Sequence, residues 1–184
     1  VGPIWFNDGS AEMPELPTGC VAVFDVQPFR NSLYRVLGLS EFQEFYVPRV
    51  VNQFLLDIHT VLGECKRVMV HKRKRNVGKL LHPKYENFMK ILVEAEDVFP
   101  VEPDIAAIKI MEGCSAVISM PFTSTAIIGR ELDKPSVYYD PSGIVQKDDR
   151  AAHGIQVLRG KGELRSWIEG LSTAPQKIPA HENA

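Results

Sequence analysis

Short apolar runs alternate with segments of helical periodicity along most of this chain, and that alternation constrains the fold more than any other feature. Residues 20–25 (CVAVFD) form a continuous run of strand length, which is typical of a strand buried on both faces of a parallel sheet. Further strands are predicted at 67–71, 98–101, 115–120, 136–140 and 155–158. The alternation predicts an α/β fold, a Rossmann-like three-layer αβα sandwich with a mostly parallel sheet of about six strands.

Helical segments separate these runs. The clearest spans residues 47–62, where apolar side chains recur at i, i+3, i+4 and i+7, with Pro48 near its start and Gly63 at its end. Others are predicted from Pro83, from Pro103 to about Gly113, at 125–132 and at 162–171. We predict one domain over residues 1–172, followed by a flexible tail at 173–184.

Composition excludes several classes of protein. The chain has 184 residues, of which 45% are hydrophobic, and a net charge of −2, so neither general disorder nor a dedicated nucleic-acid binder is expected. Its three cysteines are widely spaced, which argues against a zinc site and favours a reduced, cytoplasmic compartment. We expect no signal peptide and no transmembrane segment. The first residue is Val and not Met, so we expect a domain of a larger protein.

A basic run directly follows the second predicted strand. Ligands of open parallel sheets bind beyond the carboxyl ends of the strands, and four consecutive cations there, residues 72–75, suit phosphate groups. Because neighbouring side chains in an extended segment alternate sides, only about two can point inward, and we favour Lys72 with Arg73 or Arg75. The alternative is a solvated basic loop, or a patch for nucleic acid or a membrane.

A hydroxyl-rich loop, residues 121–125 (PFTST), connects a predicted strand to a predicted helix. The first amides of a helix lack intrahelical partners and carry the positive end of its dipole, so an anion binds well there. The hydroxyls of Thr123, Ser124 and Thr125 would add donors. Capping by Ser124 or Thr125 is the alternative, but capping explains one hydroxyl and not three. The loop lacks the glycine and lysine pattern of a Walker loop.

Carboxylates also follow two strands. Asp140 could accept a hydrogen bond from a sugar or ribose hydroxyl, but the sequence alone favours the alternative of an ordinary Asp-Pro turn. Glu102 could take ribose hydroxyls or cap a helix starting at Pro103. Asp25 and Arg30 follow the first of the strands and could face the same cleft. The sequence has no Asp-x-Asp motif and no metal-ligand cluster, so we expect no metal and no cofactor.

The run at 118–124 (ISMPFTS), together with 134–143 (KPSVYYDPSG), resembles bacterial polysaccharide-biosynthesis proteins named for a Pro-Phe-Thr-Ser motif. Residues 24–30 and the cations at 72–75 fit the same pattern, and the resemblance covers roughly residues 20–160. That family is similar to the carboxy-terminal, donor-binding domain of GT-B glycosyltransferases. The resemblance therefore implies half of a glycosyltransferase of O-antigen or capsule biosynthesis, inactive alone.

The resemblance also implies a site and partners. Thr123, Ser124 and Thr125 would hold the phosphate of a CMP-, UDP- or GDP-linked sugar, and Lys72 and Arg73 would offset its charge. The remaining members of the expected substrate-binding set are Arg75, Glu102, Pro121, Phe122 and Asp140. A separate amino-terminal domain would bind the glycan or lipid-linked acceptor. No nucleic-acid partner is implied, and the protein could associate peripherally with the inner membrane.

Three alternative interpretations stay open. The hydroxyl-rich loop is also similar to that of transferases that use CMP-activated acid sugars, but His82-Pro83 lies about ten residues beyond the strand end where their His-Pro motif is expected. A sugar-nucleotide epimerase would share the phosphate site. A non-catalytic scaffold module of a polysaccharide assembly complex would use the basic run to contact a partner or anionic lipid.

Overall fold

A single parallel sheet organises the part of the chain that the structure, a computed structural model, describes: residues 12–36, 44–73 and 77–171. Its strands are β1 (Val21–Phe24), β2 (Met69–Lys72), β3 (Val98–Val101), β4 (Ala116–Ser119), β5 (Ser136–Asp140) and β6 (Gln156–Arg159). They lie in the order β3-β2-β1-β4-β5-β6, and every neighbouring pair is parallel. The predicted Rossmann-like sheet is confirmed.

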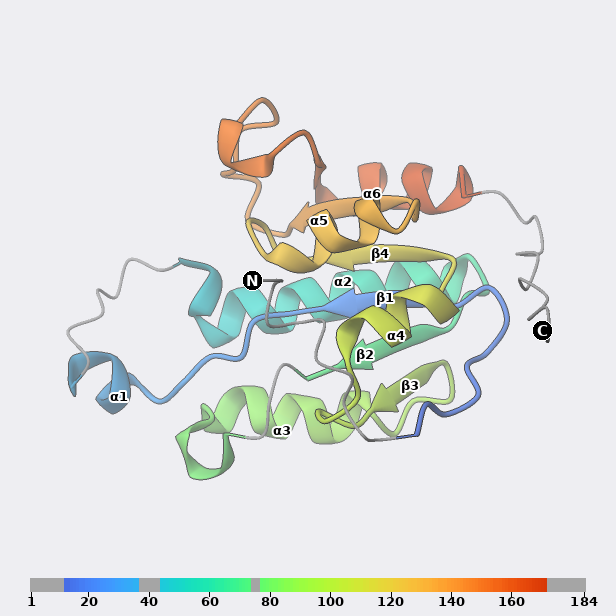
Figure 1. The fold of residues 1–184 in the computed structure, drawn as a ribbon. Helices are drawn as coiled ribbons and strands as arrows, with labels where there is room; N and C mark the ends of the chain where they lie inside the picture. Colours follow the sequence, from blue (N-terminus) through green and yellow to red (C-terminus); the bar gives the residue numbers. More distant parts are fainter. Residues whose placement is uncertain (1–11, 37–43, 74–76, 172–184) are drawn as a thin grey trace, which may run out of the picture.

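Helices cover both faces of this sheet (Figure 1). They are α1 (Asn31–Val36), α2 (Pro48–Glu64), α3 (Pro83–Leu92), α4 (Ala107–Gly113), α5 (Ser124–Glu131) and α6 (Gly160–Glu169), with 3-10 turns η2 (Glu44–Tyr46), η3 (Gly78–Leu80) and η4 (Arg150–Ala152). Helix α2 packs against both α3 and α6 on one face, while α4 and α5 pack together on the other. The result is the three-layer sandwich that the alternation predicts.

Strand β1 shows why both faces need a cover. All four of its side chains are buried. Val21 and Val23 contribute to the core beneath α2, α3 and α6, whereas Ala22 and Phe24 contribute to the core beneath α4. Side chains of a strand point alternately to the two faces, so an uninterrupted apolar run implies burial on both.

The strand order reverses between β1 and β4. The chain leaves β1 toward β2 and β3 on one side and reaches β4, β5 and β6 on the other. The backbone N–H of Met120 donates to the carbonyl of Phe24 (3.0 Å), so the two strands remain paired up to their carboxyl ends. The segments that follow then diverge to opposite sides, which is the geometry that opens a ligand crevice in this class of sheet.

Two predictions about helices need correction. The helix expected from Pro103 begins four residues later, at Ala107, because residues 102–105 form a turn closed by the N–H of Ile105 and the carbonyl of Glu102 (3.2 Å). The short helix α1 is absent from the prediction. The expected tail at 173–184 lies outside the described residues.

Candidate functional site

The Pro-Phe-Thr-Ser loop lies at the carboxyl end of β4, beside the reversal point. Pro121 is buried, and Phe122 has a left-handed backbone (φ 61°), which is uncommon for a bulky residue. The ring of Phe122 packs between Phe45 (6.3 Å between centroids) and Tyr138 (6.2 Å). The Tyr138 hydroxyl donates to the carbonyl of Thr123 (2.8 Å). These contacts hold the loop in a sparsely populated conformation, a feature that clusters at binding sites.

The three hydroxyls of this loop have different roles. Thr123 Oγ1 donates to the carbonyl of Met120 (2.7 Å) and lies 3.2 Å from Thr125 Oγ1, which in turn lies 2.8 Å from Oγ of the fully buried Ser119. Two of the hydroxyls therefore brace the turn. The hydroxyl of Ser124 is exposed and has no hydrogen-bond partner among the described residues.

The capping interpretation is wrong for Ser124 and Thr125. The N-cap residue of α5 is Thr123, and no side chain caps the helix. The first amides of α5 therefore keep donors that no side chain accepts, at the positive end of the helix dipole and next to the reversal point. This is the arrangement that the loop sequence predicts for an anion site.

The two described residues of the basic run, Lys72 and Arg73, have different surroundings. The nearly buried Lys72 points toward the end of β3, where its Nζ donates to the carbonyls of Pro103 (2.8 Å) and Arg73 (3.2 Å). Burial lowers the pKa of this amine. Arg73 points the other way and lines a cavity near α3. Adjacent side chains of an extended segment alternate sides, so Lys72 and Arg73 lie apart, and their expected joint role at a phosphate stays a prediction. Arg75 lies outside the described residues.

Asp140 holds the loop that follows β5. Its Oδ1 accepts hydrogen bonds from the amide (2.8 Å) and hydroxyl (2.5 Å) of Ser142, and its Oδ2 accepts one from the amide of Val145 (2.8 Å). The side chain is fully buried. The turn interpretation accounts for both oxygens, which makes a contact with substrate unnecessary to explain this residue.

Glu102 follows β3 and is exposed. It does not cap a helix at Pro103, because α4 begins at Ala107 behind an N-cap residue, Ala106, without a side-chain cap. The capping alternative is therefore wrong. Its place at the far edge of the strand order separates it from the loop after β4 by two strands, β2 and β1.

Comparison with known proteins agrees with the motif. A family model described as polysaccharide biosynthesis PFTS motif protein matches residues 1–168. The chain belongs to this family. Neither a curated protein nor a solved structure matches it.

Residues outside the motif also build a polar centre in this PFTS motif protein. Tyr85 of α3 donates a 2.5 Å hydrogen bond to Asp25 Oδ2, and His71 Nε2 of β2 lies 3.4 Å from the same oxygen. All three side chains are buried, and Asp25 Oδ1 has no partner in the described chain. Burial and the neighbouring Asp25 carboxylate raise the pKa of Tyr85 well above its usual value. The sequence suggested only Asp25, because Tyr85 matches the apolar stripe of its helix.

Two features of the described residues concern metal binding and membrane crossing. Among the described residues, no group of three or more His, Cys, Asp or Glu side chains is arranged to hold a metal ion. None of the described helices combines the length and apolar character that crossing a bilayer requires.

Proposed function

We propose that this PFTS motif protein binds a nucleotide-sugar as the donor-binding part of a glycosyltransferase, with the donor phosphates on the amino terminus of α5. The observation that supports this most is the α5 terminus itself, which has no side-chain cap and follows β4 at the reversal of strand order. Membership in a polysaccharide-biosynthesis family supports a nucleotide-sugar as the proposed ligand, since such polymers are commonly built from nucleotide-sugar donors.

The loop suits a phosphate ester in two ways. Its main-chain N–H groups would donate to phosphate oxygens, and the exposed Ser124 hydroxyl would add a donor. Thr123 and Thr125 would act indirectly, by holding the turn through their bonds to Met120 and Ser119. Because the donors are fixed before ligand binds, little reorganisation is needed when it arrives.

The proposed chemistry is displacement at the anomeric carbon of the sugar. The bond to the nucleotide phosphate breaks, and charge accumulates on the departing phosphate oxygens. Fixed amides and the helix dipole would stabilise that charge more strongly than they stabilise the bound ground state, and such electrostatic stabilisation is usually the largest catalytic contribution. The acceptor hydroxyl and its general base would come from elsewhere in the assembled enzyme.

Calorimetric titration tests the binding step. We would titrate the purified protein with CMP, UDP and GDP, and with each parent nucleoside as a matched ligand that lacks phosphate. The proposal expects one nucleotide to bind at least about tenfold more tightly than its nucleoside, since charge-assisted hydrogen bonds supply the difference. Equal affinity for nucleotide and nucleoside would contradict a phosphate site.

A further inference from the structure

A cavity of about 290 Å³ lies on the α3 side of the sheet, away from the Pro-Phe-Thr-Ser loop. Its lining comes from the segment after β1, from Arg73 and Val77 beyond β2, from the turn η3 with Leu81, and from Glu86 in the first half of α3. The lining residues that carry charge are Arg30, Arg73, Lys79 and Glu86. No residue of the loop at 121–125 lines it, so this cavity is separate from the α5 terminus.

The charge of the lining favours an anion. Three cations and one carboxylate give a formal charge of 3 − 1 = +2. Among the described residues, no carboxylate forms an ion pair with Arg30, Arg73 or Lys79. Glu86 instead pairs weakly with Lys90 on its own helix (3.7 Å). Unpaired cations that converge on one cavity from three elements create a positive potential that attracts a dianion.

The walls of the cavity are fixed by backbone hydrogen bonds. The amide of Arg30 donates to the carbonyl of Leu80 (2.9 Å), and the amide of His82 donates to the carbonyl of Pro28 (2.9 Å). These bonds flank an antiparallel bridge between Phe29 and Leu81. Arg30 therefore adjoins this bridge, and Lys79 lies in the turn η3 beside it, so the backbone that carries both cations is held in place, an arrangement that favours preformed recognition.

Buried polar groups form one side of the same region. Gln27, only 5% exposed, lines the cavity. Tyr85 precedes Glu86 on α3, and Arg73 lowers the pKa of Tyr85 against the opposing effects of burial and Asp25. Arg73, which lines the cavity, is therefore close enough to Tyr85 to act on it electrostatically.

We propose that this cavity is a second anion site that binds a phosphomonoester group through Arg30, Arg73 and Lys79. A phosphomonoester carries a charge near −2 at neutral pH, which matches the +2 of the lining. Arginine forks suit its oxygens because they donate two parallel hydrogen bonds. Pockets for drug-sized ligands span about 300–1,000 Å³, so a cavity at the lower limit suits a phosphate ester and not a complete nucleotide-sugar.

The test measures phosphate binding by calorimetry on the whole protein at constant ionic strength, with inorganic phosphate and then glycerol 3-phosphate as probes. Arg30→Gln and Arg73→Gln should each weaken binding about tenfold or more, since each removes a charge-assisted hydrogen bond. Arg150→Gln, an exposed cation on η4, is the matched control and should leave the affinity unchanged. Glu86→Gln should strengthen binding, because the lining gains a net positive charge.

A vesicle arm separates two sources of the same chemical group. Binding to soluble phosphates supports a free phosphorylated metabolite as the ligand. Binding only to phosphatidylcholine vesicles that contain phosphatidic acid, and loss of that binding in Arg30→Gln, supports a lipid phosphomonoester headgroup. Absence of both kinds of binding would overturn the proposal. So would phosphate binding that is unchanged in Arg30→Gln and Arg73→Gln but weakened in Ser124→Pro, which would place the anion on α5 alone.

Discussion

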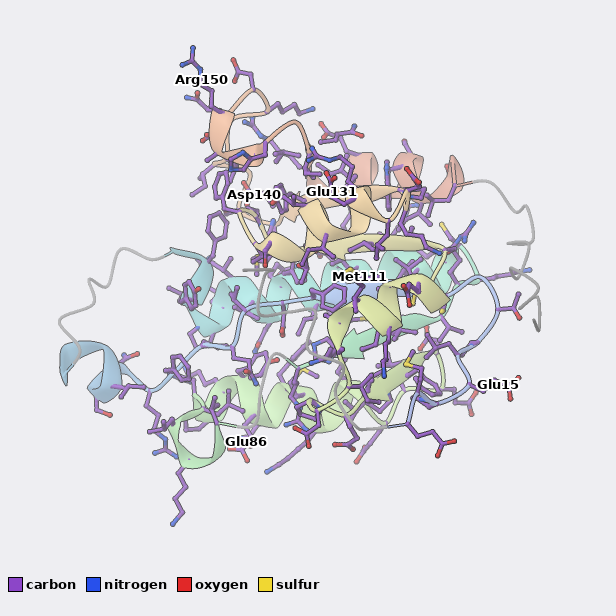
Figure 2. The ribbon with its side chains drawn as sticks, viewed as in Figure 1. Glu15, Glu86, Met111, Glu131, Asp140 and Arg150 are labelled. Carbon is purple, nitrogen blue, oxygen red and sulfur yellow. The ribbon has the colours of Figure 1, made fainter. Side chains whose placement is uncertain are left out.

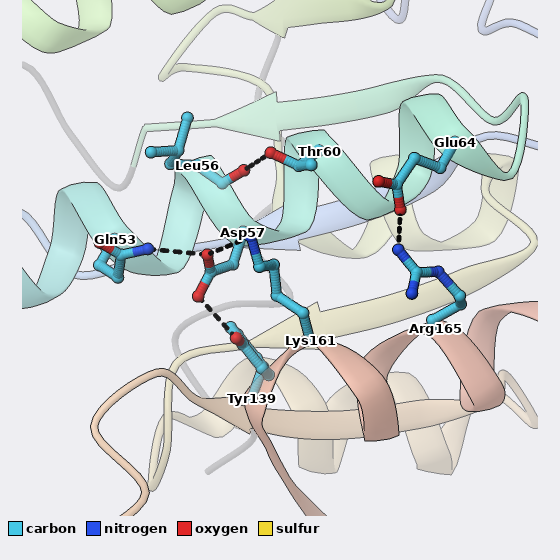
Figure 3. Close-up of polar contacts among 8 residues, drawn as sticks. All are labelled: Gln53, Leu56, Asp57, Thr60, Glu64, Tyr139, Lys161 and Arg165. Atoms are coloured by element: carbon cyan, nitrogen blue, oxygen red, sulfur yellow. Dashed lines mark hydrogen bonds and ion pairs between the residues drawn. The ribbon is translucent and has the colours of Figure 1, made fainter.

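The hydroxyl of Tyr139 donates a 2.7 Å hydrogen bond to Asp57 Oδ2 and so joins the carboxyl end of β5 to the middle of α2 (Figure 3). Gln53 Nε2 donates to the other carboxylate oxygen (2.7 Å), and Lys161 Nζ of α6 lies 4.0 Å from it. Tyr138, which precedes Tyr139 in β5, points to the opposite face of the sheet, where its hydroxyl donates a hydrogen bond to the carbonyl of Thr123. Two adjacent tyrosines thus fix β5 to both outer layers.

Tyr139→Phe should lower the free energy of unfolding by about 1–3 kcal/mol, because the substitution removes the donor and leaves Asp57 Oδ2 buried without it. Urea denaturation monitored by circular dichroism measures the difference. Tyr46→Phe is the matched control, since that hydroxyl has no hydrogen-bond partner among the described residues. It should change stability by less than about 0.5 kcal/mol. Equal stabilities of the two variants would show that the Tyr139–Asp57 bond contributes little.

Stability should fall steeply in alkaline solution. Burial, followed by the interactions with Asp25 and Asp57, raises the pKa of both Tyr85 and Tyr139 above the usual value of about 10. The folded protein then holds these protons more tightly than the unfolded chain. Their contribution is fully present below about pH 10 and is lost as the pH rises further, by up to about 1.4 kcal/mol per pH unit for each tyrosine.

Urea denaturation between about pH 8 and about pH 11 tests this dependence. Tyr139→Phe should reduce the slope of stability against pH above about pH 10, whereas Tyr46→Phe should keep the slope of the wild type. A wild-type slope near zero in that range would indicate that the two buried hydroxyls ionise as readily in the folded protein as in the unfolded chain.

Gly129 allows α5 to lie close against the sheet. A Cβ there would lie 2.5 Å from Ser136 Oγ and 2.8 Å from Val117 Cγ2. Gly129→Ala should therefore destabilise the protein by about 1–3 kcal/mol, which exceeds the gain of about 1 kcal/mol that alanine brings to a helix interior. Gly162→Ala in α6 meets nothing within 4 Å and should be neutral or stabilising. Thermal unfolding of the two variants gives shifts of opposite sign if this packing is as described.

The strands could be predicted from the sequence because burial on both faces leaves an uninterrupted apolar run. Residues 98–101 and 136–140 were predicted at the boundaries that β3 and β5 have. The sequence predicts a helix start at Pro103 because proline is acceptable in a first helical turn. In the structure α4 begins only at Ala107, and the carbonyl of Pro103 accepts a hydrogen bond from Lys72. The different positions of Lys72, the last residue of β2, and of Arg73, which follows it, agree with the alternation of side chains in an extended segment.

The buried hydrogen bonds of Tyr85 with Asp25 and of Tyr139 with Asp57 could not be predicted, because they are tertiary contacts between residues far apart in the sequence. Asp25 and Tyr85 are 60 positions apart, and Asp57 and Tyr139 are 82 apart. Each tyrosine also satisfies a local apolar pattern, so periodicity assigns it to the core and is silent about its hydroxyl. The cavity beside Arg73 could not be predicted for the same reason, since it depends on the pairing of the segment after β1 with residues 78–82.

Ser124→Pro removes two proposed phosphate donors, the amide and the hydroxyl of Ser124, and keeps the helix. Ser124 is the first residue of α5, a position where proline is tolerated, and the preceding Thr123 has an extended backbone (φ −89°, ψ 146°) that suits a following proline. Ala107→Pro is the matched control, because it occupies the same position of α4 behind an extended Ala106 (φ −62°, ψ 134°). Both variants lose one N–H at a helix start, but only one of them lies at the proposed donor site.

The dissociation constant of the tightest-binding nucleotide for these two variants tests the central claim most directly. If the donor phosphate lies on the amino terminus of α5, Ser124→Pro should weaken binding by about tenfold or more, since it removes a charge-assisted hydrogen bond, and Ala107→Pro should bind as the wild type does. Wild-type affinity in a folded Ser124→Pro variant would contradict the claim that α5 holds the donor phosphate.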